Sequence, residues 1–205
     1  SGEGSALMKK PGLAAEIIFA VKKAVDRPVT VKFRSGWDKD HINAVEFARM
    51  AYESGADGLC IHGRTSRQLY RGKADPEIMA KVVDAVPIPV MVNGDITDRK
   101  SANDLLAATG ARFALVGRGA LGNPWVFEAE PRTPSIEERL SEYLRQTEMA
   151  AEQKGERRAL LESRAHISQY LTGFRGAAVF RSRAVSVSTL AQARALVEEI
   201  LSQAE

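Results

Sequence analysis

Four short apolar runs, separated by amphipathic stretches, constrain the fold of this chain more than any other feature of its sequence. They cover residues 29–33, 58–61, 90–92 and 113–116 and are rich in β-branched side chains, which is typical of strands. Their centres recur about every 25 to 30 residues, the length of a βα unit. Because nearly every position in them is apolar, we predict a parallel sheet that is buried on both faces.

The intervening stretches have the apolar spacing of helices, at residues 12–25, 42–54, 76–85 and 100–109. After residue 124 the pattern changes, and a proline-containing linker precedes three further helical stretches, at 136–153, 158–171 and 190–202. We therefore predict a βα domain over residues 1–130 and a helical domain over residues 131–205.

The composition excludes several classes of protein. With 44% hydrophobic and 27% charged residues, the chain is typical of soluble globular proteins, and its longest apolar runs are too short to span a bilayer. The single cysteine, Cys60, excludes a disulfide framework and a cysteine-based zinc site. We expect a cytoplasmic protein without a metal. Since no initiator Met or signal peptide opens the chain, we also expect it to begin inside a longer gene product or to carry a processed start.

The net charge of +3 is small, but basic residues gather in the predicted helical domain. Between Arg157 and Arg183 there are six arginines and one acid, Glu162, which makes this stretch a candidate surface for a polyanion. The alternative is a solvated helical face, on which the arginines pair with neighbouring acids along the helices.

Polar residues follow each predicted strand, where functional residues of parallel βα folds stand. Lys32 and Arg34 share one face of the first strand, and His62 ends the second. Each has a structural alternative, because a strand-end histidine is often a hydrogen-bonded structural residue and the two cations could lie at an exposed edge. Four successive strands that all end in polar residues favour a functional site.

The last two strand ends indicate a phosphate site. Small residues in Asn93-Gly94-Asp95 and Gly117-Arg118-Gly119-Ala120 allow backbone N–H groups to approach a phosphate, and Arg118 can contact it through two N–H groups. A (β/α)8 barrel commonly binds phosphate after strands seven and eight. We therefore predict an α/β fold, the C-terminal half of a TIM (β/α)8 barrel (strands five to eight), followed by a small all-helical domain.

The ordered motifs of this chain resemble those of the tRNA-dihydrouridine synthases, nearest to the bacterial B-type branch. The matching segments are residues 4–8 (GSALM), 31–37 (VKFRSGW), 61–65 (IHGRT), 70–75 (YRGKAD), 92–96 (VNGDI), 116–120 (VGRGA), 123–125 (NPW), 164–166 (RAH) and 170–173 (YLTG). The resemblance covers nearly the whole chain and implies an FMN enzyme that reduces uridine in tRNA to 5,6-dihydrouridine with NADPH.

The resemblance also implies roles for individual residues. Lys32 and His62 would contact the flavin, and the ribityl phosphate would be held by Asn93, Gly94, Asp95, Gly117 and Arg118. Substrate contacts would come from Arg34, Tyr70, Arg164 and His166, with the helical domain binding tRNA.

One departure from the family concerns the proton donor. The family's acid is a cysteine in an Asn-x-Gly-Cys-Pro motif just upstream of the segment that residues 4–8 resemble, so we expect no catalytic residue in this chain and an inactive fragment. Cys60 lies within a predicted strand and is expected to pack as a small hydrophobe. Open strand edges could also drive self-association of the half barrel. The alternatives are an RNA- or phosphate-binding half barrel without catalysis and another FMN-binding barrel oxidoreductase.

Overall fold

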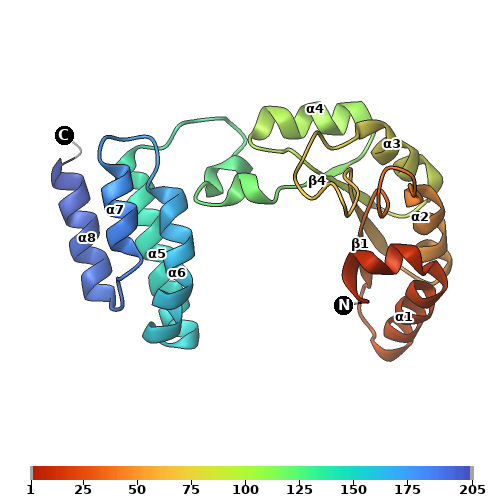
Figure 1. The fold of residues 1–205 in the computed structure, drawn as a ribbon, viewed down its shortest axis with the longest axis horizontal. Coiled ribbons are helices and arrows are strands. Elements are labelled where there is room, and N and C mark those ends of the chain that lie inside the picture. The colour runs from red at the N-terminus through yellow and green to blue at the C-terminus, as the bar shows by residue number, and fades with distance from the viewer. Residues whose placement is uncertain (1, 204–205) are drawn as a thin grey trace. The chain divides into compact units, whose positions relative to one another are not determined.

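The computed structural model describes residues 2–203, and the chain divides into two compact units, Ser1–Gly119 and Ala120–Glu205 (Figure 1). The predicted boundary, at residue 130, lies later in the chain than this division. The linker predicted at residues 131–135 therefore belongs to the second unit. Each unit is described by itself below.

The first unit contains a parallel four-stranded sheet in the order β1-β2-β3-β4. Its strands are β1 (Thr30–Arg34), β2 (Gly58–His62), β3 (Val90–Asn93) and β4 (Phe113–Leu115). The four strands predicted from the apolar runs are thus confirmed, and so is their parallel arrangement. The register pairs Arg34 with His62, His62 with Asn93 and Asn93 with Leu115, so the carboxyl ends of all four strands are level.

Helices alternate with these strands, as the sequence predicts. They are α1 (Pro11–Ala24), α2 (Ala44–Glu53), α3 (Pro76–Ala85) and α4 (Arg99–Thr109), and a short 3-10 helix, η1 (Gly4–Lys9), precedes α1. Local signals fix the helix ends. The Asp75 side chain accepts from the first N–H groups of α3, and Asp98 forms a capping box with Ser101 at the start of α4.

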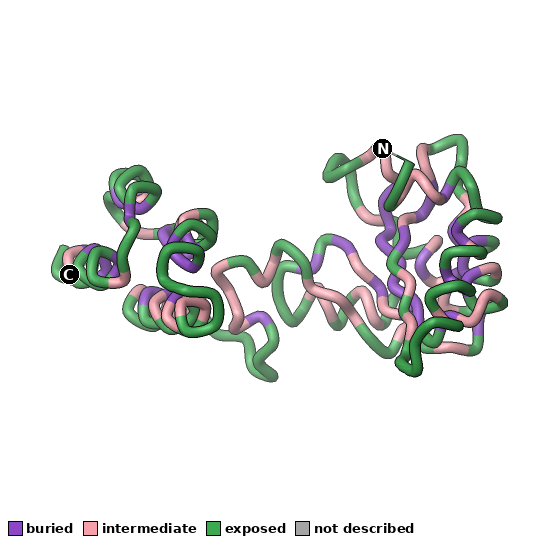
Figure 2. Tube along the Cα trace, turned by 90° about the horizontal axis from the view of Figure 1, so that it is seen from below, coloured by how far each residue is buried: buried purple, intermediate pink, exposed green. Residues whose placement is uncertain are grey.

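The core of this unit lies between the sheet and its helices. Helix α2 contacts β1 and β2, α3 contacts β2 and β3, and α4 contacts β3 and β4, so these helices cover one face in sequence order. Leu59, Ile61, Met79, Val82 and Val92 are fully buried there. Figure 2 marks the buried positions along the backbone of the chain. Burial of this apolar surface stabilises the sheet and holds the level strand ends in place.

The second unit is helical. It contains the short 3-10 helix η3 (Pro124–Phe127) and four α-helices, α5 (Ile136–Lys154), α6 (Glu156–Tyr170), α7 (Ala177–Ala184) and α8 (Leu190–Gln203). The sequence predicts three of these α-helices but not α7. That helix is short, and its buried residues, Ala177, Phe180 and Ala184, form too brief an apolar pattern to be recognised. Within residues 2–203, no helix is both long enough and apolar enough to cross a membrane.

Candidate phosphate-binding pocket

A cavity of about 480 Å³ opens at the carboxyl ends of the strands in the first unit. It brings together all seven residues that the sequence assigns to a cofactor, and it also includes Arg34 and Tyr70. The lining residues are Lys32, Arg34, His62, Tyr70, Asn93, Gly94, Asp95, Ile96, Thr97, Gly117, Arg118 and Gly119. The two remaining candidates, Arg164 and His166, belong to the second unit. The level register of the strands explains why residues so distant in sequence share one cavity.

Cations outnumber acids in this cavity. Lys32, Arg34 and Arg118 line it, and Asp95 is the one acid among its lining residues. The Arg118 side chain is 59% exposed, lies 4.0 Å from the Asp95 carboxylate, and has its guanidinium carbon 4.1 Å from the centre of the Tyr70 ring. Because this cation is only loosely paired, it is available to an anionic ligand.

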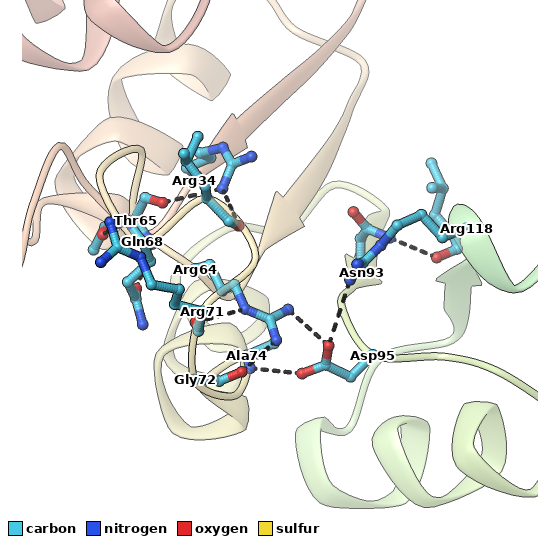
Figure 3. A network of polar contacts seen from close by, with 12 residues as sticks. Arg34, Arg64, Thr65, Gln68, Arg71, Gly72, Ala74, Asn93, Asp95 and Arg118 are labelled. Atoms are coloured by element: carbon cyan, nitrogen blue, oxygen red, sulfur yellow. Dashed lines mark hydrogen bonds and ion pairs between the residues drawn. The ribbon is translucent and has the colours of Figure 1, made fainter.

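Asp95 is held by protein groups on both of its carboxylate oxygens. One oxygen lies 2.7 Å from a guanidinium nitrogen of Arg64, and the other accepts from the Ala74 N–H at 2.8 Å (Figure 3). Burial raises the pKa of Asp95, but the hydrogen bonds from Arg64 and Ala74 and the charges of Arg64 and Arg118 outweigh burial and hold the pKa below its ordinary value. The carboxylate is therefore ionised and already engaged.

The turn after β3 has a backbone that few residues can adopt. Gly94 has a φ of +142° and Asp95 a φ of +56°. A Cβ at position 94 would lie 2.4 Å from the Ala74 Cβ and 3.3 Å from the His62 ring. Glycine at this position thus lets His62 and Ala74 close around the turn.

His62 is buried at the floor of the pocket. Burial, followed by the charges of Arg34, Lys32 and Arg64, lowers the pKa of His62 to about 4, so its ring is neutral near pH 7. Among the described residues, no group of three or more His, Cys, Asp or Glu side chains could hold a metal ion.

Comparison with known proteins identifies the family of this chain. A family model described as dihydrouridine synthase (Dus) matches residues 1–205. The chain belongs to the dihydrouridine synthase family. The family predicted from the ordered motifs is therefore confirmed.

Individual members of the dihydrouridine synthase family support the same assignment. The probable tRNA-dihydrouridine synthase 1 of a Synechocystis species is 38% identical over 100% of this chain and 60% of its own length. The tRNA-dihydrouridine synthase B of Pseudomonas aeruginosa is 38% identical over 88% of this chain and 57% of its own length. The tRNA-dihydrouridine synthase B of Proteus vulgaris is 48% identical over 60% of this chain and 38% of its own length. These B-type relatives support the predicted branch. The chain spans 57–60% of the length of the first two relatives.

A solved structure of nitroalkane oxidase from Streptomyces ansochromogenes also overlaps this dihydrouridine synthase family chain. The overlap covers 60% of this chain and 41% of the oxidase chain, with 23% identity and a TM-score of 0.34. An overlap of this quality supports no conclusion about the chain.

The cysteine of this family member is a buried strand residue. Cys60 is 4% exposed and pairs with Lys32 across β1 and β2. Burial raises the pKa of the Cys60 thiol, and the nearby charge of Lys32 only partly offsets that effect. A thiol with a raised pKa in a strand fits the packing role that the sequence indicates.

The arginines of the helical unit divide into paired and unpaired side chains. Arg158 pairs with Glu162 at 3.2 Å, and Arg183 pairs with Glu199, an acid that lies outside the basic stretch from Arg157 to Arg183. Among the described residues, the side chains of Arg157 and Arg175 have no hydrogen-bond or ion-pair partner. The basic surface is therefore smaller than six arginines suggest.

The two helical-unit residues predicted to contact substrate differ in their surroundings. The Arg164 Nε donates to the Val187 carbonyl at 3.1 Å, and its side chain is half-buried. His166 is exposed on the same helix, α6. Arg164 therefore has a structural role within the helical unit, in addition to any contact with substrate.

Proposed function

We propose that this chain is the flavin-phosphate side of an FMN-dependent tRNA-dihydrouridine synthase, joined to a helical tRNA-binding domain. In this proposal the four strands are strands five to eight of a (β/α)8 barrel. The observation that carries the proposal is the single pocket that collects all seven predicted cofactor residues from the ends of three strands and the loop after β4. Four consecutive strand ends that converge in this way are typical of a barrel ligand site.

The residues of the pocket fit a phosphate ester. Its volume lies within the range of about 300 to 1,000 Å³ that small-molecule sites usually have. Arg118 and Lys32 supply positive charge. Apart from the chain neighbours of Gly117, no atom of the described residues lies within 4 Å of a Cβ placed on Gly117, which leaves space beside its backbone. Because the Asp95 carboxylate is engaged by Arg64 and Ala74, the group that Asp95 offers a phosphate is its backbone N–H.

The proposed reaction is the reduction of a uridine in tRNA to 5,6-dihydrouridine, with NADPH as the source of electrons. FMN, when bound, would supply hydride to C6 of the uracil ring. In this chain, Lys32 and His62 would orient the flavin, while Arg34 and Tyr70 would face the base. A proton must also reach C5, and the buried thiol of Cys60 is poorly suited to deliver it.

A binding titration tests the cofactor proposal. The Arg118→Ala variant should bind FMN and inorganic phosphate about tenfold more weakly than the original chain, because a charge-assisted contact is lost. Arg112→Ala is the matched control, since Arg112 is an exposed arginine at the start of β4, away from the pocket. Equal FMN affinity in both variants would count against the site. We expect the purified chain to retain little FMN, and a stoichiometric yellow preparation would contradict this expectation.

An activity assay tests the second part of the proposal, that the 205-residue chain does not reduce uridine by itself. The chain is supplied with FMN, NADPH and unmodified tRNA, and dihydrouridine is measured. We expect none to form. A longer chain that adds an Asn-x-Gly-Cys-Pro segment and four further strands should be active, and activity of the 205 residues alone would refute the proposal.

A binding module without catalysis is the second candidate function. It is favoured by a pocket whose residues fit a phosphate, together with a cysteine that is buried and does not line this pocket. Within the described residues, β1 and β4 are the outer strands of the sheet, and their unpaired backbone groups could join a second copy of the chain. Size-exclusion chromatography over a range of concentrations distinguishes self-association from a stable monomer.

A further inference from the structure

The loop between β2 and α3, residues 63–75, crosses the carboxyl ends of the strands and is bound to more than one of them (Figure 3). On one side, Arg34 at the end of β1 donates to the Thr65 carbonyl at 3.0 Å and lies 3.5 Å from the Leu69 carbonyl. On the other side, the Ala74 N–H donates to Asp95, after β3. The loop therefore forms a wall of the pocket whose position depends on side chains from the strand ends.

Arg64 makes the largest number of these contacts. Its Nε donates to the Arg71 carbonyl at 3.2 Å, one terminal nitrogen donates to the Gly72 carbonyl at 2.6 Å, and the other lies 2.7 Å from the Asp95 carboxylate. The rigid fork of a guanidinium suits this three-way contact, which a lysine could not reproduce. Only 3% of Arg64 is exposed, and it is not among the residues that line the pocket.

The contacts of Arg64 connect two walls of the pocket. Asp95, its partner, belongs to the turn after β3, whose left-handed backbone positions Gly94 against Ala74. Arg71 and Gly72 belong to the loop that carries Tyr70. Fixing their carbonyl groups to Asp95 thus ties the Tyr70 segment to the phosphate turn.

Tyr70 shows what this tie does for the pocket. Its ring is 4.1 Å from the guanidinium of Arg118. Arg118 follows β4, which lies at the opposite edge of the sheet from β1 and Arg34. Because 61% of Tyr70 is exposed, the surrounding protein holds it weakly, and its place depends on the loop. The preceding residue, Leu69, has a φ of +52°, a conformation that persists in a leucine only where its surroundings impose it.

We propose that Arg64 is a positioning residue for this pocket. It holds the Tyr70 segment to the turn at Asp95, and through this segment it sets the affinity of the pocket for a phosphate-bearing ligand that Arg64 itself does not touch. The inference rests on the proposed function for the identity of the ligand, but the control of the loop by Arg64 does not.

FMN titration followed by fluorescence tests the effect on affinity. Arg64→Gln should weaken FMN binding by about tenfold or more, whereas Arg71→Gln, an exposed arginine of the same loop whose carbonyl is kept, should stay within about twofold of the original chain. If Arg64 acts by placing Tyr70, the double variant Arg64→Gln/Tyr70→Ala should bind FMN no more weakly than whichever of the two single variants, Arg64→Gln or Tyr70→Ala, binds FMN more weakly. Additive losses, or normal affinity in Arg64→Gln, would overturn the proposal.

Limited trypsin digestion measures how readily the loop of residues 63–75 opens when no ligand is present. Cleavage after the exposed Arg67 should be at least about fivefold faster in Arg64→Gln than in the original chain or in Arg71→Gln. If the original chain binds neither FMN nor phosphate, the proposed function fails, while unchanged cleavage in Arg64→Gln overturns the positioning role. Should Arg64→Gln not fold, Arg64→Lys keeps the charge beside Asp95 and should show an intermediate cleavage rate, and a rate equal to that of the original chain would overturn the role.

Discussion

The ammonium group of Lys32 lies 3.3 Å from the side-chain oxygen of Asn93, although 61 positions separate the two residues in the chain. The nitrogen of the same Asn93 amide donates to the Leu115 carbonyl at 2.7 Å. Asn93 thereby connects the ends of β1, β3 and β4. An aspartate at this position would turn an oxygen toward the Leu115 carbonyl, so the amide is required for both contacts.

The Asn93→Ala variant should bind FMN about three- to tenfold more weakly, because hydrogen bonds that orient Lys32 and the β4 end each contribute about 0.5–1.5 kcal/mol. Isothermal titration calorimetry measures the change. Asn103→Ala, on the exposed surface of α4, is the control and should bind normally. Equal affinities in the two variants would contradict this role of Asn93.

Acid should destabilise the first unit through His62. Since its folded pKa, about 4, lies below the ordinary value of 6.5, the unfolded state takes up the proton first as the pH falls. The unfolding free energy should therefore decrease between pH 6.5 and pH 4, by about 3 kcal/mol at most. Urea unfolding followed by tryptophan fluorescence measures this decrease in a Trp125→Phe background, in which Trp37 is the remaining tryptophan. His62→Asn should flatten the dependence of the unfolding free energy on pH, and His166→Gln should leave it unchanged. If the two variants show the same dependence on pH, His62 is not its source.

Salt-dependent tRNA binding should report the unpaired arginines of the helical unit. Arg157→Ala and Arg175→Ala should each reduce the slope of log affinity against log salt by about one, as expected for a lost phosphate contact. Arg158→Ala and Arg183→Ala, which remove arginines paired with Glu162 and Glu199, should change it less. If all four variants keep the original slope, the helical unit does not bind RNA through these arginines.

The end of α6 should depend on Arg139. Its guanidinium donates to the carbonyl groups of Tyr170 and Thr172 and to the Thr172 hydroxyl. Arg139→Ala should lower the unfolding free energy of the helical unit by about 1 to 2 kcal/mol and speed hydrogen exchange in α6. Arg145→Ala removes an exposed pair with Glu142 on α5 and should cost less than about 0.5 kcal/mol. Equal exchange rates in the two variants would argue against Arg139 as the support of this helix end.

The thiol of Cys60 should react slowly with thiol reagents in the folded chain. Because burial raises its pKa, a thiol reagent should modify it at least about tenfold more slowly in the folded chain than in urea. Cys60→Ala should bind FMN within about twofold of the original chain. Fast modification, or loss of FMN binding in this variant, would give the cysteine a role that its strand position does not suggest.

The strands, and the polar residues that follow them, could be predicted from the sequence because both depend on local patterns. Apolar runs after breaker residues predict β1 to β4, and parallel register then brings Lys32, His62 and Asn93 to one edge. Helix α7 was missed because its apolar pattern is short. The role of Arg64 was missed because it depends on Arg71, Gly72 and Asp95, which lie at distances that no local pattern encodes.

Backbone crowding at two glycines has a consequence for how this pocket can change over evolutionary time. A Cβ at Gly94 would lie 2.4 Å from Ala74, and one at Gly119 would lie 2.4 Å from the Ile96 carbonyl oxygen. Side chains cannot be added there without moving main chain, so the floor of the pocket is fixed. Lys32, Tyr70 and Arg118 are exposed and free of this restriction. New ligand preferences should therefore arise by substitution at the rim, while the floor is inherited unchanged.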